Sequence, residues 1–150
     1  MLAASVGERA VSLFGQGHNC AQAVLMAVAE QHDLQVSPAV ASAFGGGMAR
    51  TGQTCGAVTG ALMALGLGYG ERPGEGDPRE SVSDVGRQLM DDFAERFGST
   101  DCEELIKGRF AIATTPPTYC VDTKKELCRE LVRCAAEAAH QSLGMLGPLV

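Results

Sequence analysis

A stretch of twenty residues without a charged side chain, residues 51–70, most constrains what this chain can fold into. Its length would allow a helix across a bilayer, but glycines and polar residues interrupt it, and its apolar part covers only residues 57–67. An apolar run of that length is typical of a core helix. The sequence therefore predicts a helix buried inside the fold and no membrane insertion.

Small residues recur at every fourth position of this segment, on one side of the expected helix. They are Gly52, Gly56, Gly60, Ala64 and Gly68. Glycine inside a helix costs up to about 1 kcal/mol relative to alanine, so a close approach of another group should compensate for it. Two interpretations stay open: a tight crossing with a second helix, or room for a cofactor or partner beside Cys55, with Gly56 and Gly60 as cofactor-binding residues.

Helix-starting signals recur along the whole chain, with little competing strand pattern. Capping side chains stand at Asn19, Ser37, Thr54, Asp77, Asp101 and Thr123. A first helix is expected from Val6 to about Phe14, before the glycines that follow. We predict an all-α fold, a single-domain bundle of six or seven helices over residues 1–150.

Two helix boundaries in the second half of the chain depend on glycine and proline. The helix that starts at Asp101 should end at Gly108. Residues 109–122 contain two consecutive prolines, so we predict an irregular segment there. The last helix should then start at Thr123.

Charge and composition exclude several classes of function. Twelve Lys and Arg residues against eighteen Asp and Glu residues leave a net charge of −6, which argues against a general nucleic-acid binder. Aromatic residues make up only 5% of the chain, so bases would find few stacking partners. Glu8 and Arg9 interrupt what would have to be the apolar core of a signal peptide. We therefore expect a cytoplasmic protein.

Six cysteines are the main chemical feature of the chain. They stand at Cys20, Cys55, Cys102, Cys120, Cys128 and Cys134. In a reducing compartment they are metal ligands, redox thiols or small buried side chains rather than a disulfide framework. The absence of any C-x-x-C pair excludes zinc ribbons, thioredoxin-type sites and ferredoxin-type runs. A shared site must therefore be assembled from distant segments.

Three of these cysteines directly follow a predicted helix cap. Cys20, Cys55 and Cys102 would each be the first residue of a helix. Unpaired N–H groups there carry partial positive charge, which lowers a thiol pKa and stabilises the thiolate. We expect Cys55 in particular to be a thiolate near neutral pH. Each cysteine alone is more often a small buried side chain.

Six short segments resemble one known family. They are residues 19–24, 44–48, 55–63, 101–105, 128–132 and 135–137. In this order they are similar to the C_GCAxxG_C_C family of redox-active proteins, over nearly the whole chain. The resemblance implies four family cysteines: Cys20, Cys55, Cys102 and Cys128. A similar module is associated with an iron–sulfur centre in a multihaem cytochrome, whereas this chain has no C-x-x-C-H haem site.

Three hypotheses follow for these residues. In the first, the four family cysteines are metal ligands that hold an iron–sulfur cluster, or zinc, for electron transfer. In the second, no metal is bound and two thiols cycle through a disulfide, with Cys55 and Cys20 as the catalytic candidates. In the third, the chain is a helical partner-binding module with structural cysteines. We favour the first, because four dedicated cysteines exceed what disulfide exchange needs. A redox partner protein and a homo-oligomer both stay open.

The remaining candidates are weaker. Cys134 lies six residues after Cys128, about 120° around the same helix, and should pack away from the site. His32 and His140 are expected near helix ends, where a cationic side chain suits the helix dipole. Arg50 would either stabilise a thiolate or be a surface charge.

Overall fold

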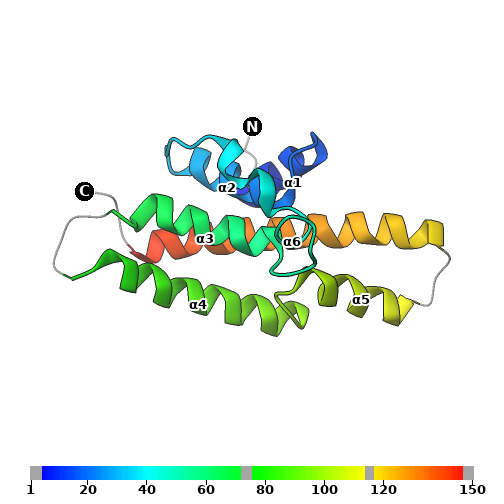
Figure 1. The fold of residues 1–150 in the computed structure, drawn as a ribbon. Helices are drawn as coiled ribbons and strands as arrows, with labels where there is room; N and C mark the ends of the chain where they lie inside the picture. Colours follow the sequence, from blue (N-terminus) through cyan, green and yellow to red (C-terminus); the bar gives the residue numbers. More distant parts are fainter. Residues whose placement is uncertain (1–4, 72–75, 114–116, 147–150) are drawn as a thin grey trace.

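The described residues form seven helical segments (Figure 1). The structure, a computed structural model, describes residues 5–71, 76–113 and 117–146, and only the backbone within 108–113 and 117–123. The segments are α1 (Val6–Gly15), α2 (Cys20–Gln31), the 3-10 helix η1 (Pro38–Phe44), α3 (Gly56–Tyr69), α4 (Pro78–Phe97), α5 (Cys102–Ala113) and α6 (Pro117–Leu146). Within these ranges there is no strand, only an isolated bridge between Thr54 and Asp101. The predicted all-α bundle is confirmed.

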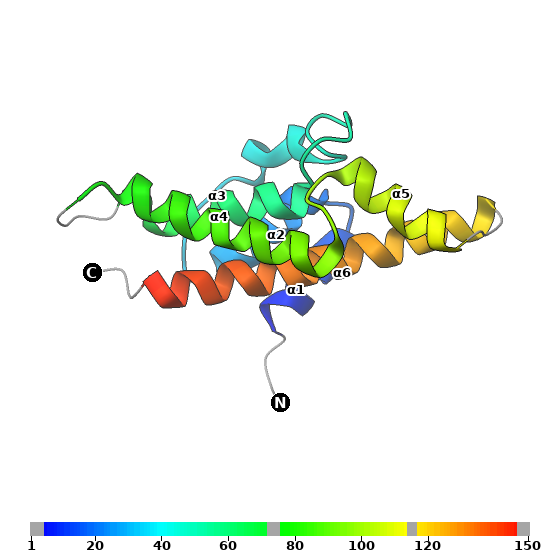
Figure 2. The same cartoon turned by 90° about the horizontal axis from the view of Figure 1, so that it is seen from below.

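The long helix α6 organises the bundle. It runs along the molecule and contacts α1, α2, α3, α4 and α5 (Figures 1 and 2). Figure 2 shows α4 and α5 following one another along α6, with α5 beside its first half. The helices α1 and α2 pack together on the other side of α6. None of the helices in the part of the chain described is both long and apolar enough to cross a membrane.

Local signals in the sequence start and stop most of these helices. The Asn19 side chain accepts a hydrogen bond from the N–H of Gln22 (2.8 Å), and the Gln22 side chain accepts one from the N–H of Asn19 (3.1 Å), which completes a capping box. Asp77 caps α4, with Pro78 at its first position. Gly98 ends α4 with φ of 92°, a left-handed conformation that glycine adopts without strain.

Three predicted boundaries are wrong. The cap of α3 is Cys55, not Thr54, because Thr54 pairs with Asp101 instead. Helix α5 continues past Gly108 to residue 113, since one internal glycine weakens a helix without ending it. Helix α6 begins at Pro117, six residues before the predicted start, because proline is well tolerated at the first helical position.

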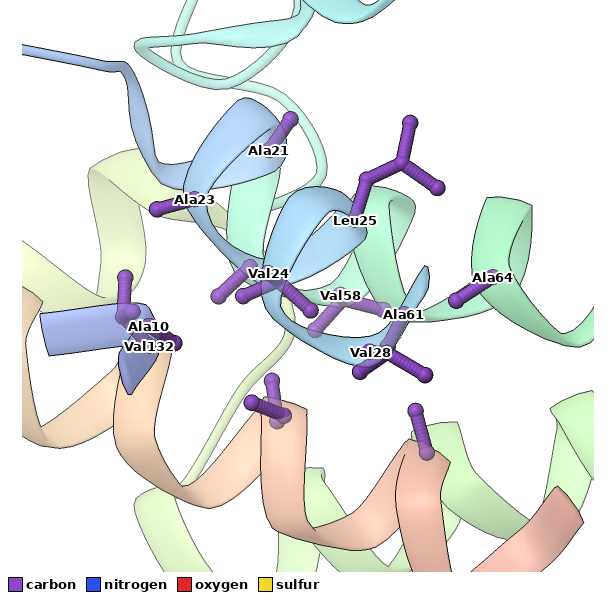
Figure 3. Packing of buried hydrophobic residues seen from close by; sticks show 14 of the residues in the cluster. Ala10, Ala21, Ala23, Val24, Leu25, Val28, Val58, Ala61, Ala64 and Val132 are labelled. Carbon is purple, nitrogen blue, oxygen red and sulfur yellow. The ribbon is translucent and has the colours of Figure 1, made fainter. Parts of the chain in front are cut away.

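Where α2 meets α3, the core is rich in small side chains that allow close helix packing. Val24 and Val28 of α2 lie beside Val58 and Ala61 of α3 (Figure 3), and all four are fully buried. A side-chain carbon at Gly60 would come within 2.5 Å of the Ala21 carbonyl oxygen. The small-residue side of α3 therefore makes a tight crossing with α2.

The predicted stripe of small residues extends over less of the chain than expected. Gly52 precedes the helix, in a loop with φ of 76°, so the stripe begins at Gly56. At its other end, a side-chain carbon at Gly68 would lie 2.7 Å from the Leu143 side chain of α6. The stripe thus brings α3 close to two different helices.

Candidate functional site

One cavity of about 660 Å³ brings the four family cysteines together. Cys20, Cys55, Cys102 and Cys128 all line it, from the start of α2, the start of α3, the start of α5 and the middle of α6. Its volume lies within the range typical of small-molecule and cofactor sites. Segments separated by up to about a hundred residues therefore contribute to a single site.

The start of α2 is tied to η1 through side chains beside Cys20. The Asn19 side-chain amide donates hydrogen bonds to the carbonyl oxygens of Ala41 (3.2 Å) and Ser42 (3.1 Å). The Gln22 amide donates to the carbonyl oxygen of Pro38 (3.1 Å). The capping residues of α2 thus also anchor η1, which leads into the segment that lines the cavity from Gly46 to Gly52.

Backbone hydrogen bonds hold Cys55 and Cys102 in one frame. The N–H of Cys55 donates to the Thr100 carbonyl (2.7 Å), and the N–H of Cys102 donates to the Gln53 carbonyl (2.6 Å). The Thr54–Asp101 bridge lies between these two bonds. Because the bonds involve the backbone of each cysteine, they fix the separation of the two residues more firmly than side-chain packing would.

A left-handed turn precedes the segment that is hydrogen-bonded to residues 100–103. Five consecutive residues have positive φ: Gly46 (64°), Gly47 (74°), Met48 (66°), Ala49 (54°) and Arg50 (60°). The three that are not glycine cost of order 1–3 kcal/mol each in such a conformation. Hydrogen bonds from the N–H groups of Gly52 and Gln53 to the carbonyls of Gly46 and Gly47 (3.1 and 2.8 Å) stabilise the turn. The three glycines at 45–47 indicate a turn after η1 in the sequence, but its left-handed continuation through residues 48–50 was not predicted.

Gly47 allows the turn to approach Cys102. A side-chain carbon at Gly47 would lie 2.7 Å from Cβ of Cys102 and 2.6 Å from the backbone nitrogen of Gln53. The turn also places Arg50, Thr51 and Gly52 on the cavity wall. It therefore positions both a cysteine and part of the lining of the site.

Burial raises the pKa of three cavity thiols, Cys55, Cys102 and Cys128. Cys55 is only 4% exposed, and burial, followed by the neighbouring Cys20, raises its pKa to about 12, although backbone N–H groups of α3 act in the opposite direction. Burial and Cys20 also raise the pKa of Cys128 to about 11 and that of Cys102 above its usual value. The prediction that Cys55 is a thiolate near neutral pH is wrong for the protein without a bound cation, because desolvation outweighs the helix N-terminus.

Neighbouring cysteines contribute to these raised pKa values. The charge of Cys20 acts on Cys55, Cys102 and Cys128, and that of Cys102 acts on Cys55 and Cys128. Thiolates this close repel one another, so a cation is needed before all four can ionise. Among the residues that the structure describes, no three His, Cys, Asp or Glu side chains are grouped closely enough to hold one metal ion.

The other predicted site residues lie elsewhere. Gly56 and Gly60 are not among the described residues that line the cavity. A side-chain carbon at Gly56 would lie 2.9 Å from Cys20 Sγ, and Gly60 packs against the backbone of Ala21. Cys134 is half-buried outside the described lining, with Sγ 3.7 Å from a Glu130 carboxylate oxygen. The side chain of Cys120 lies outside the described residues.

The two histidines predicted at helix ends form a pair instead. His32, which caps the C-terminus of α2, has Nε2 2.9 Å from Nδ1 of His140 on α6. Burial, and then the neighbouring His140, lowers the pKa of His32. The pair therefore disfavours the cationic form that the dipole argument assumed for His32.

Comparison with known protein families matches residues 18–142 to the family described as "Putative redox-active protein (C_GCAxxG_C_C)". The chain belongs to this family. The matched region contains all four cysteines of the cavity. The family is described as redox-active, and this description applies to the chain as a member. Comparisons with curated proteins and with solved structures gave no significant match.

Proposed function

We propose that Cys20, Cys55, Cys102 and Cys128 bind an iron–sulfur cluster through their thiolates and that the protein transfers electrons. The observation that carries this proposal is the cavity that all four side chains line. Four cysteine thiolates are the usual ligand set of such clusters, and the family is a redox-active one. When bound, the cluster supplies one-electron redox chemistry.

A metal-free dithiol mechanism fits the site less well. The thiolate, not the thiol, attacks a disulfide. With pKa values of about 12 for Cys55 and about 11 for Cys128, these two side chains are protonated at neutral pH and would react slowly. Raised pKa values are no obstacle to a ligand role, because metal binding itself displaces the protons.

The size of the cavity that the four cysteines line favours a cluster over a single zinc ion. Four sulfurs around one tetrahedral zinc lie about 4 Å from one another, given zinc–sulfur bonds of about 2.3 Å. No three potential ligands in the described part of the chain are grouped in that way. Ligands spread around the wall of a cavity of about 660 Å³ suit a group with several metal centres.

The protein's own residues contribute position and protection from water. The hydrogen-bonded segments 52–55 and 100–103 hold Cys55 and Cys102 at a fixed separation, while the capped α2 presents Cys20. Apolar lining side chains, among them Phe14 and Leu131, limit the entry of water. Proton release on binding makes uptake weaker as the pH falls. The proposal includes a redox partner protein and a reducing, cytoplasmic environment.

The experiment is anaerobic reconstitution with iron and sulfide, followed by iron, acid-labile sulfide and zinc assays and a visible spectrum. We expect bound iron and sulfide in the wild type and their loss in Cys55→Ser, which replaces a soft ligand by a protonated hydroxyl. Cys134→Ala is the matched control and should keep full metal content. Circular dichroism checks that both variants remain helical. A wild type that binds zinc or no metal, or a Cys55→Ser variant with full iron content, would contradict the proposal.

A further inference from the structure

The wall of the four-cysteine cavity is positively charged, although the chain has a net charge of −6. Of the described lining residues, three are cationic, Arg50, Lys107 and Lys124, and one is a carboxylate, Glu103. Lys107 and Glu103 pair with each other at 2.7 Å. No other described side chain forms an ion pair with Arg50 or Lys124. Arg50 and Lys124 therefore have no ion-pair partner among the described side chains, while the carboxylates of Asp101 and Glu103 also act on Cys102.

These two cations come from elements that also position the cysteines. Lys124 precedes Cys128 by one turn of α6, and its positive charge acts on both Cys102 and Cys128. Arg50 is the last residue of the left-handed turn, where a side-chain carbon at Gly46 would come within 2.9 Å of its Cα. The backbone of both cations is therefore held at the cavity.

We propose that Arg50 and Lys124 make the four-cysteine cavity selective for anions, so that its occupant is a sulfur-bound group with a net negative charge. An iron–sulfur core with a charge of about +2, bound by four thiolates, has a net charge of about −2. The positive charges of Arg50 and Lys124 balance it. Apolar lining residues such as Ile106 and Leu131 strengthen the attraction, because charges interact more strongly beside low-dielectric walls. This inference deepens the proposed function, which supplies the identity of the occupant, but the selectivity can be measured without a cluster.

The test compares two thiol probes on the metal-free protein. One probe is the dianionic aromatic disulfide dithiobis(nitrobenzoate), and the other is the neutral disulfide dithiodipyridine. In both reactions a protein thiolate forms a mixed disulfide and releases one aromatic thiol. Because the same thiolates react with both probes, the fraction of thiolate cancels in the ratio of the two rates. The ratio therefore reports the effect of probe charge. Every protein tested also carries Cys120→Ser and Cys134→Ala, so that the four cavity thiols are the ones left to react.

We expect Lys124→Gln and Arg50→Gln each to lower the ratio of anionic to neutral rate by about threefold or more. Lys125→Gln is the matched control, because it removes the same charge from the next residue, which is exposed and not among the described lining residues. It should leave the ratio unchanged. Added salt should reduce the wild-type ratio toward that of Lys124→Gln, since ions screen exposed charges.

An unchanged ratio in both cavity variants, or an equal decrease in Lys125→Gln, would overturn the inference. The reconstituted protein provides a second measurement: Lys124→Gln should lower the reduction potential relative to Lys125→Gln, because a nearby cation stabilises the reduced, more negative state. A wild type that takes up no iron and sulfide would contradict the proposed function while the rate ratio still decides the selectivity.

Discussion

The tight crossing of α2 and α3 and the four-cysteine cavity at its end are built in different ways. The crossing depends on side-chain size: its alanines and valines are fully buried, and Gly60 lies against the Ala21 backbone. The cavity depends on backbone geometry, namely the left-handed turn at 46–50 and the hydrogen bonds between segments 52–55 and 100–103. Stability and metal uptake should therefore respond to different substitutions.

The largest effect is expected at the crossing. Gly60→Leu places a branched side chain where even one carbon would come within 2.5 Å of the Ala21 carbonyl oxygen. We expect the free energy of unfolding to fall by about 1–3 kcal/mol, as in other overpacked cores. Denaturant unfolding of the metal-free protein measures it.

A matched pair within α3 isolates the cause. A carbon added at Gly66 meets no heavy atom within 4 Å, so Gly66→Ala should gain up to about 1 kcal/mol of helix propensity. Gly60→Ala should instead destabilise the protein. If the two alanine variants change stability equally, close packing is not the reason for Gly60.

The next effect concerns the cavity. Gly47→Ala combines φ of 74° with carbon contacts of 2.6 Å to the Gln53 nitrogen and 2.7 Å to Cys102 Cβ. We expect a local cost of about 1–3 kcal/mol, displacement of Cys102 and a clear loss of iron and sulfide after reconstitution. Helical content should change little, because the turn lies outside the helices.

Gly17→Ala is the control for this variant. Gly17 also has positive φ, 105°, but a carbon added there meets nothing within 4 Å. It therefore carries the conformational strain without the contact with Cys102. If Gly17→Ala reduces metal content as much as Gly47→Ala does, general destabilisation explains both and the positioning role of the turn is refuted.

The contrast between the helix crossing and the cavity also explains which features the sequence could predict. Helix caps such as Asn19–Gln22 and Asp77–Pro78 involve residues a few positions apart, so the pattern contains the information. The close packing at Gly60 was one of two interpretations, and only the position of Ala21 distinguishes between them. The helix start at Pro117 was missed because proline is equally common in loops.

The cavity was less accessible to sequence reasoning. The resemblance indicated which four cysteines to consider, but their pKa values depend on burial and on one another, which no local pattern encodes. The pairing of Thr54 with Asp101 joins segments about fifty residues apart and moves the helix cap to Cys55. The cationic lining by Arg50 and Lys124 likewise arises only when the turn and α6 come together.

A smaller effect, of opposite sign, is expected within the turn. Ala49 is exposed and has φ of 54°, so Ala49→Gly should relieve strain and raise the free energy of unfolding by up to about 1 kcal/mol. Metal content should stay the same, because no side-chain contact with a cysteine is lost. Ala43→Gly, at an exposed position without positive φ, is the control and should lower stability slightly. Destabilisation by Ala49→Gly would mean that the turn carries no relievable strain.

The smallest effect concerns the histidine pair at the C-terminal end of α2. It tests whether a fall in pH lowers the stability of the helix packing without any contribution from the cavity thiols. Because burial and His140 lower the pKa of His32, the unfolded chain binds this proton more readily than the folded protein does. The contribution of His32 to stability is therefore complete above the unfolded pKa of about 6.5 and is lost as the pH falls below it. Denaturant unfolding of the metal-free protein between about pH 5 and pH 8 measures it without interference from proton-linked metal release.

His32→Gln keeps a hydrogen-bonding group near the position of Nε2 but cannot titrate, so it should flatten this part of the stability profile. His18→Gln, which removes a histidine outside the pair, is the matched control for the loss of one imidazole. The assay stays above pH 5, because Glu30, whose pKa the Arg9 side chain lowers, affects stability only in more acidic solution. An identical slope in the wild type and His32→Gln would show that the pair is a neutral packing contact, and that acid destabilises the metal-free protein only through its carboxylates.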